Sequence, residues 1–251
     1  QSTRDWDAGN GAPNAPLGGD GIWVESGISN LWQRDALDNQ RFVPGDDAVF
    51  GPSADTSPYA VTVDTEVNVR DITFDTDGVT IEGAGQLNVG RDIAVTTAGD
   101  AAEIAVQIGT DATVDGAGDL TLSGGVDGAV TMEGTGTVSI LSTVESLTAT
   151  TGTSDIGANG VVTGTTTIAG GDVVVSGGTL TDTTSLSAGS LTVDTGAVGA
   201  VANDGGRVEV NGGTVASVAN TSGTFRITGG TVSGDTVNNG TLELGGGTLN
   251  D

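Results

Sequence analysis

The chain has 251 residues with no histidine, cysteine or lysine; seven arginines oppose 33 acidic residues, giving a net charge of −26. Such a charge repels nucleic acid phosphates and anionic lipid headgroups, so we expect no nucleic acid partner and no membrane insertion. Without cysteine there is no disulfide or thiol chemistry, and without histidine there is no Ser-His-Asp or Cys-His site and no histidine-bound zinc.

The N-terminal part of the chain, as far as Tyr59, differs from the rest. Residues 1–20 are rich in Gly, Asn, Pro and Ala, which predicts an irregular N-terminal arm. Residues 21–59 carry most of the aromatic side chains: Trp23, Trp32, Phe42, Phe50 and Tyr59. We interpret this segment as an aromatic cap that covers the exposed first strands of a repeat structure. The alternative is an exposed aromatic platform of the kind that binds carbohydrate.

A five-residue pattern, Gly-x-Φ-x-Φ with Φ apolar, returns at intervals of roughly 17 residues in the segment 60–251, and a short fixed period indicates that each repeat is one turn of a stack. The clearest copies are GRVEV at 206–210, GTFRI at 223–227 and GTLEL at 240–244. Each is followed in register by a second marker, GGTV, GGTV or GGTL, beginning at 212, 229 and 246.

The repeat can be followed back along most of this segment. Copies begin at 70, 85, 102, 118, 136, 171, 189, 206, 223 and 240. One further copy is expected near 153, where TSDIG does not fit, and we predict a distorted turn or an outward loop there. The segment therefore predicts about eleven turns. It stops in mid-repeat at GGGTLND, so we expect either more turns beyond Asp251 or another chain over an open end, and we favour more turns.

Apolar residues alternate within each copy, which is the periodicity of a β-strand. A single five-residue strand cannot bury one face, but stacked copies can align their inward side chains in continuous columns. The expected fold is all-β, a single-stranded parallel β-helix (β-solenoid). We expect the right-handed form, because the six-residue units typical of left-handed β-helices are not visible.

Two outward positions of the repeat predict ladders along the stack. Glu209, Arg226 and Glu243 occupy one slot and would form an alternating charge ladder. Thr179, Thr214, Thr231 and Thr248 occupy another. Stacked threonines of this kind either stabilise a turn or, as a flat array, bind ice; we favour the structural role.

The stretch from 21 to 89 resembles the start of a passenger segment in autotransporter-type surface proteins. The matching pieces, in order, are GIWV at 21–24, NLW at 30–32, VPGDDAVFG at 43–51, VTVDTEVNV at 61–69 and ITFDTDGVTIEGAGQLNV at 72–89. The departure is Leu31, which separates an Asn-Trp pair that is usually adjacent. The translocating barrel of an autotransporter is not part of this chain.

The resemblance implies a bacterial protein that is extracellular or on the outer cell surface, a structural or adhesive rod with roles in adhesion or biofilm matrix. Its partners would be surface or matrix components, glycans among them, and a homo-oligomer could form through the open C-terminal turn. Two alternatives stay open. One is a self-assembling filament or surface-layer subunit, and the other is a polysaccharide-active β-helix enzyme.

Carboxylates are the remaining source of chemistry. Asp46–Asp47 and Asp75–Asp77 are candidate pairs for glycoside hydrolysis. Neighbours in a strand point to opposite faces, so Asp46 and Asp47 should not converge. Of the arginines within the repeats (Arg70, Arg91, Arg207 and Arg226), none is expected in an acidic cluster of the kind that lyases use. The expectation is no enzyme, no catalytic residue and no cofactor site.

Calcium is the one cofactor left open. DTDG at 75–78 resembles the start of a calcium loop. The third acidic ligand and the downstream Glu of such a loop are misplaced, so no metal ligand is assigned.

Overall fold

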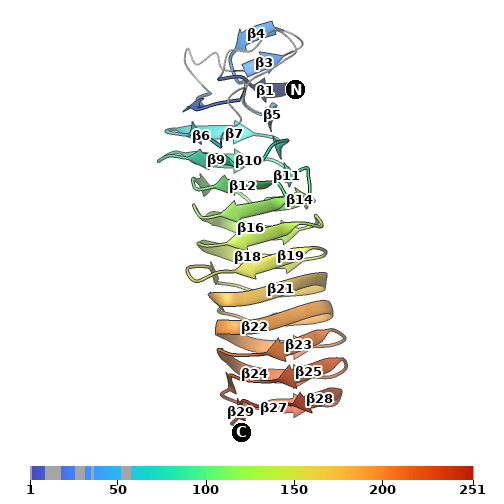
Figure 1. Ribbon diagram of the computed structural model, residues 1–251. Coiled ribbons are helices and arrows are strands. Elements are labelled where there is room, and N and C mark those ends of the chain that lie inside the picture. The colour runs from blue at the N-terminus through green and yellow to red at the C-terminus, as the bar shows by residue number, and fades with distance from the viewer. Residues whose placement is uncertain (1, 9–17, 26–31, 35–36, 52–57, 251) are drawn as a thin grey trace. The chain divides into compact units, whose positions relative to one another are not determined.

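The computed structural model describes residues 2–8, 18–25, 32–34, 37–51 and 58–250. In this part of the chain every regular element is a strand, and the strands build a parallel β-solenoid of about 11 turns with about 18 residues per turn (Figure 1). The predicted fold class is therefore confirmed. The chain divides into two compact units, residues 1–127 and 128–251.

In the first unit, each turn contributes strands to three columns, and strands within a column pair in parallel. The first column is β2 (Gly21–Ile22), β6 (Tyr59–Thr62), β9 (Val79–Glu82), β12 (Ala101–Ile104) and β15 (Asp119–Leu122). The second is β7 (Glu66–Val69), β10 (Gln86–Val89), β13 (Gln107–Ile108) and the start of β16 (Val126–Met132). The third is β1 (Thr3–Trp6), β5 (Asp47–Phe50), β8 (Ile72–Phe74), β11 (Asp92–Val95) and β14 (Ala112–Gly116).

The second unit repeats the three columns with longer strands that run through the corners. Its first column contains β17 (Thr137–Ile140), β19 (Thr153–Ile156), β21 (Thr166–Leu180), β22 (Thr184–Asn203), β23 (Arg207–Val210), β25 (Thr224–Ile227) and β28 (Thr241–Leu244). The other two add β18 (Thr143–Ala149), β20 (Val161–Val162), β24 (Thr214–Asn220), β26 (Thr231–Val232), β27 (Thr236–Asn238) and β29 (Thr248–Leu249).

The register of the last turns is the predicted one. Val208 pairs with Phe225, and Phe225 pairs with Leu242, so the partners follow one another at equal intervals along the chain. Val208 and Phe225 are fully buried, as their inward slot requires. The alternating burial of β23 and β25 follows directly from the two-residue period of an extended chain.

The register predicted for residues 70–89 is wrong. The sequence pattern assigns the copies beginning at 70 and 85 to one slot of successive turns, yet they form β8 and β10, which lie in different columns. Turns in this unit are also longer than the last turns of the chain, since Glu66 pairs with Gln86, and Ile72 pairs with Ile93. Strands of all three columns begin after a turn and alternate in the same way, so the pattern could not separate them.

The expected irregularity near 153 is also wrong. Residues 153–156 form β19, which pairs in parallel with β17 and β21. Ser154 stands where Val138 and Val173 stand in the neighbouring turns, and it is fully buried. A polar residue in an inward slot hid the strand from the hydrophobic pattern.

The threonine column has a gap. Thr179 pairs with Ala197, and Ala197 pairs with Thr214, so those two threonines are two turns apart. Thr214, Thr231 and Thr248 do follow one another in consecutive turns. The ladder is therefore continuous over three turns only.

The N-terminal segment is more regular than the sequence predicted. Residues 3–6 of the expected arm form β1, which extends the third column, and Trp6 is fully buried. Part of the expected cap also joins the stack, through β2 and β5. On the other side of β1, the strands β3 (Trp32–Arg34) and β4 (Leu37–Gln40) pair antiparallel, which ends the parallel order.

Aromatic rings fill the interior at this end. Trp6 lies 4.9 Å from Trp32, and Trp23 lies 5.0 Å from Phe42 and 5.6 Å from Phe50, measured between ring centroids. All five rings are at most 1% exposed, so they form a buried core and present no platform to a ligand. The bulky rings fill the interior of the first turns, as aliphatic side chains fill the interior of the later ones.

Candidate functional site

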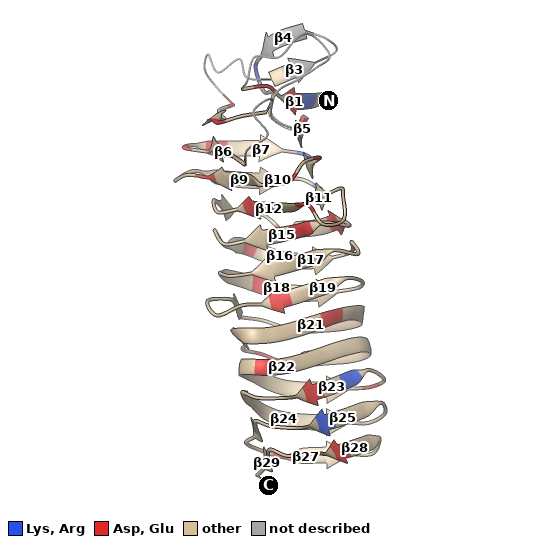
Figure 2. Ribbon diagram, viewed as in Figure 1, with Lys and Arg blue, Asp and Glu red and all other residues tan. Residues whose placement is uncertain are grey.

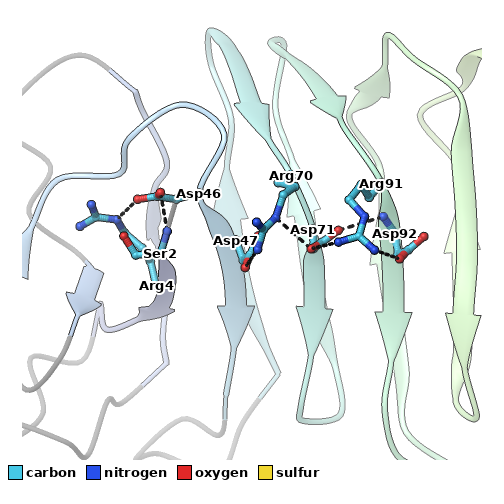
Figure 3. A network of polar contacts seen from close by, with 8 residues as sticks. All are labelled: Ser2, Arg4, Asp46, Asp47, Arg70, Asp71, Arg91 and Asp92. Atoms are coloured by element: carbon cyan, nitrogen blue, oxygen red, sulfur yellow. Dashed lines mark hydrogen bonds and ion pairs between the residues drawn. The ribbon is translucent and has the colours of Figure 1, made fainter.

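The first unit carries a line of alternating charges, which we call the arginine–aspartate ladder: Asp47, Arg70, Asp71, Arg91 and Asp92 (Figure 3). Its members lie at the starts of β5, β8 and β11. Because these strands are neighbours in the third column, the same corner recurs from turn to turn and brings the charges into line.

Arg70 is the centre of this ladder. Its Nε donates to Asp47 Oδ1 at 2.6 Å and to Asp71 Oδ2 at 3.2 Å. Arg91 follows more loosely, with its guanidinium 3.7 Å from Asp71 and 3.8 Å from Asp92. The hydrogen bond to Asp47 raises the pKa of Arg70 above its ordinary value. The ion pairs of Arg70 with Asp47 and Asp71 were not predicted from the sequence.

Asp46 points to a different partner from Asp47. Its Oδ2 accepts a 2.6 Å hydrogen bond from Arg4 Nε, and its Oδ1 accepts from the backbone N–H of Ser2 at 2.9 Å (Figure 3). Both Arg4 and Asp46 are buried. Burial by itself would raise the pKa of Asp46, but the hydrogen bonds and the charge of Arg4 outweigh it and lower the pKa. The two carboxylates diverge, as adjacent residues of an extended chain should.

The second candidate pair, Asp75 and Asp77, accepts hydrogen bonds from a side chain and a backbone N–H of the next turn. Thr96 Oγ1 donates to Asp75 Oδ1 at 2.8 Å, and the N–H of Ala101 donates to Asp77 Oδ1 at 2.8 Å. These contacts order the turn between β8 and β9. Among the described residues, no group of three or more His, Cys, Asp or Glu side chains could hold a metal ion.

The predicted charge ladder of the second unit is present. Arg226 Nη1 lies 2.7 Å from Glu209 Oε1 and Nε lies 3.6 Å from Glu243 Oε2. Arg207 adds a 2.8 Å contact to Glu209 from within β23. Figure 2 shows these basic and acidic positions on adjacent strands β23, β25 and β28. The hydrogen bond from Arg207, with the charge of Arg226, lowers the pKa of Glu209.

A second ladder in this unit, which the sequence pattern did not predict, is made of the buried Asn203 and Asn220 and the half-buried Asn238. Asn203 Nδ2 donates to Asn220 Oδ1 at 2.8 Å, and Asn220 Nδ2 donates to Asn238 Oδ1 at 2.5 Å. Asn203 Oδ1 also accepts the backbone N–H of Gly206 at 2.9 Å, which fixes the corner after β22. The available signal was the recurrence of Asn at 203, 220 and 238, close to the interval of the repeat itself.

A groove of about 300 Å³ lies beside Arg70, along the corner between the second and third columns of the first unit. Asn68 and Asn88, outward residues of β7 and β10, form one wall. Arg70, Gly45, Gly90 and Thr110, with the largely buried Val69 and Val89, complete the lining. The repeat pattern of this region does not predict the groove.

The geometry defines the class of the molecule, a three-column parallel β-solenoid whose successive turns are joined by side-chain ladders. No protein-family model, curated protein or solved structure matches the chain. Within the described ranges, no helix has the length and apolar character needed to cross a membrane.

Proposed function

We propose that this protein is a secreted structural and adhesive solenoid, exposed at the surface of a bacterium, where it displays or holds and does not convert a substrate. Two lines of support differ in kind. One is the resemblance of residues 21–89 to autotransporter passenger segments. The other is the set of side-chain ladders that join one turn to the next, and this observation carries the proposal.

The ladders suit a protein that must resist extension. Removing one turn breaks the backbone hydrogen bonds of three strands and the side-chain contacts of that turn together. In the second unit these contacts include the Asn203–Asn220 hydrogen bond and the Arg226–Glu209 ion pair. The acidic exterior keeps such a surface hydrated and limits non-specific association, because added Asp and Glu favour solubility.

The proposal is tested on intact cells of the producing bacterium. Antibodies against the purified protein should label unpermeabilised cells, and external protease should remove the label. Beads coated with the protein should adhere to cells or to extracellular matrix more strongly than beads coated with a globular protein of equal charge. Labelling that appears only after permeabilisation would contradict the proposal.

A further inference from the structure

The groove beside Arg70 runs along the stack within the first unit. Its lining comes from successive turns, with Gly45 ahead of β5, Asn68 in β7, Asn88 in β10 and Thr110 after β13. Asn68 and Asn88 are register partners on neighbouring strands, about 4.8 Å apart, so the groove offers the same amide contact at two successive steps. An extended ligand with repeating units matches this arrangement better than a compact one.

Gly90 has no structural reason to be glycine. Its φ lies outside the left-handed region, and a Cβ placed there would meet Arg70 Cα and Val69 O at 3.5 Å, which is ordinary contact. By contrast, a Cβ at Gly83 would lie 2.2 Å from Val63 O, and that residue needs a φ of 127°. The fold therefore tolerates a side chain at 90, and what such a side chain would fill is the groove.

The wall of the groove is ordered before any ligand arrives. Asn88 Nδ2 donates to Asn68 Oδ1 at 3.0 Å and to Glu66 Oε1 at 2.9 Å. The backbone N–H of Asn68 is itself held by Glu25. In the described part of the chain, Asn88 Oδ1 receives no hydrogen bond, so it can accept one from a ligand hydroxyl. Pre-ordered groups cost less entropy when a ligand binds.

Charge and polarity narrow the class of ligand. Arg70 is the charged residue that lines the groove, and its guanidinium is already paired with Asp47 and Asp71. With this charge neutralised, in a chain of net charge −26, the groove disfavours an anionic ligand. An apolar ligand would strip water from the amides without replacing their hydrogen bonds. A neutral polyhydroxylated ligand satisfies the amides with its hydroxyls.

From these observations we infer that this groove binds a neutral oligosaccharide lying along the first unit, with Asn68 and Asn88 as its polar contacts and Gly90 leaving room for a sugar ring. The volume of about 300 Å³ is at the lower end for ligand pockets, which suits one or two sugar rings and modest affinity. The inference rests on the proposed adhesive function in one respect: the oligosaccharide would be the partner to which the protein adheres.

The test titrates the purified full chain with neutral oligosaccharides of glucose, galactose, mannose and N-acetylglucosamine, with oligogalacturonate as the anionic comparison. Side-chain amide resonances of Asn68 and Asn88 are followed by NMR. At least one neutral oligosaccharide should give saturable shifts at both residues. Gly90→Gln should weaken that binding at least tenfold, and Asn88→Ala should weaken it severalfold.

Two matched controls separate binding from folding. Gly245 follows β28 as Gly90 follows β10, and a Cβ there would also meet only ordinary contacts, at 3.6 Å or more, so Gly245→Gln should bind like the parent. Asn211→Ala, which removes an exposed amide of the second unit, should also leave binding unchanged. If Gly90→Gln fails to fold, Asn88→Ala still decides the question.

Binding to none of the neutral sugars, equal binding by Gly90→Gln, or tighter binding of oligogalacturonate would each overturn the inference. The adhesion assay on beads stays independent. Beads that adhere while the groove binds no sugar would refute this site and leave the proposed function standing. If the groove binds sugar but the protein is found only inside cells, the inferred site stands and the proposed function is refuted.

Discussion

The side-chain amide of Asn203 donates a 2.8 Å hydrogen bond to Oδ1 of Asn220, one turn further along the second unit, and both side chains are fully buried. Each amide thereby satisfies its neighbour in the next turn. Buried amides are costly unless all their donors and acceptors are used, so the ladder is stable only as a set. The ladder also favours one strand register, because a slip by one residue would leave each asparagine without its partner in the next turn.

Asn220→Ala should lower the free energy of unfolding of the second unit by about 3 kcal/mol, because it removes the buried hydrogen bonds from Asn203 to Asn220 and from Asn220 to Asn238 and Thr241 O. Circular dichroism during urea unfolding measures the change, and hydrogen exchange locates it around Asn203 and Asn238. Asn211→Ala, which truncates an exposed amide, is the control and should cost less than about 1 kcal/mol. Equal losses for the two variants would show that the ladder contributes nothing special.

Arg226→Glu should lower the midpoint of unfolding at low salt, because it places three like charges in line with Glu209 and Glu243. The attraction lost is about 0.2–1 kcal/mol for each exposed pair, and repulsion adds to it. The difference from the parent should shrink in about 1 M NaCl, where charges are screened. The double variant Glu209→Arg with Arg226→Glu should recover part of the loss; no recovery would argue against direct pairing.

Asp46→Asn should loosen the N-terminal cap at neutral pH and have little effect in acid. The folded pKa of Asp46 is lowered, so its contribution to stability is complete above the unfolded value of about 3.9 and is lost as the pH falls through the folded value. All three tryptophans lie in the aromatic core at this end of the chain, so their fluorescence reports its unfolding directly.

At pH 7, Asp46→Asn should lower the free energy of unfolding of the cap by about 2–3 kcal/mol. The difference from the parent should decrease steadily toward pH 2. Asp235→Asn, at an exposed position of the second unit, should leave the fluorescence transition unchanged at both pH values. A gap between parent and Asp46→Asn that is constant with pH would contradict the ion-pair explanation.

Thr184→Val should stabilise the second unit by about 1 kcal/mol, because valine has nearly the same shape and removes the cost of burying an unpaired hydroxyl. The Thr184 side chain is fully buried, and its hydroxyl has no hydrogen-bond partner among the described residues. Thr192→Val, at an outward position of β22, should change stability far less. A destabilised Thr184→Val variant would mean that the hydroxyl is bonded in solution.

The sequence alone was sufficient to predict the β-solenoid, its number of turns and the register of its last turns. Strand alternation places Val208 and Phe225 inward, and a constant turn length returns the same slot at each step. The pairing of Glu209, Arg226 and Glu243 follows from the same regularity. Where all turns have the same length, the spacing of residues in the sequence is enough to predict which residues pair in neighbouring turns.

Only the tertiary structure decided the remainder, because contacts between turns depend on turn lengths that vary. The first unit has longer turns, so neither the column of β10 nor the line from Asp47 through Arg70 to Asp71 could be read from spacing. Burial of Trp6 in the aromatic core, and of Ser154 in an aliphatic column, likewise depends on neighbours that are distant in sequence. The groove beside Gly90 exists only where two columns of strands meet.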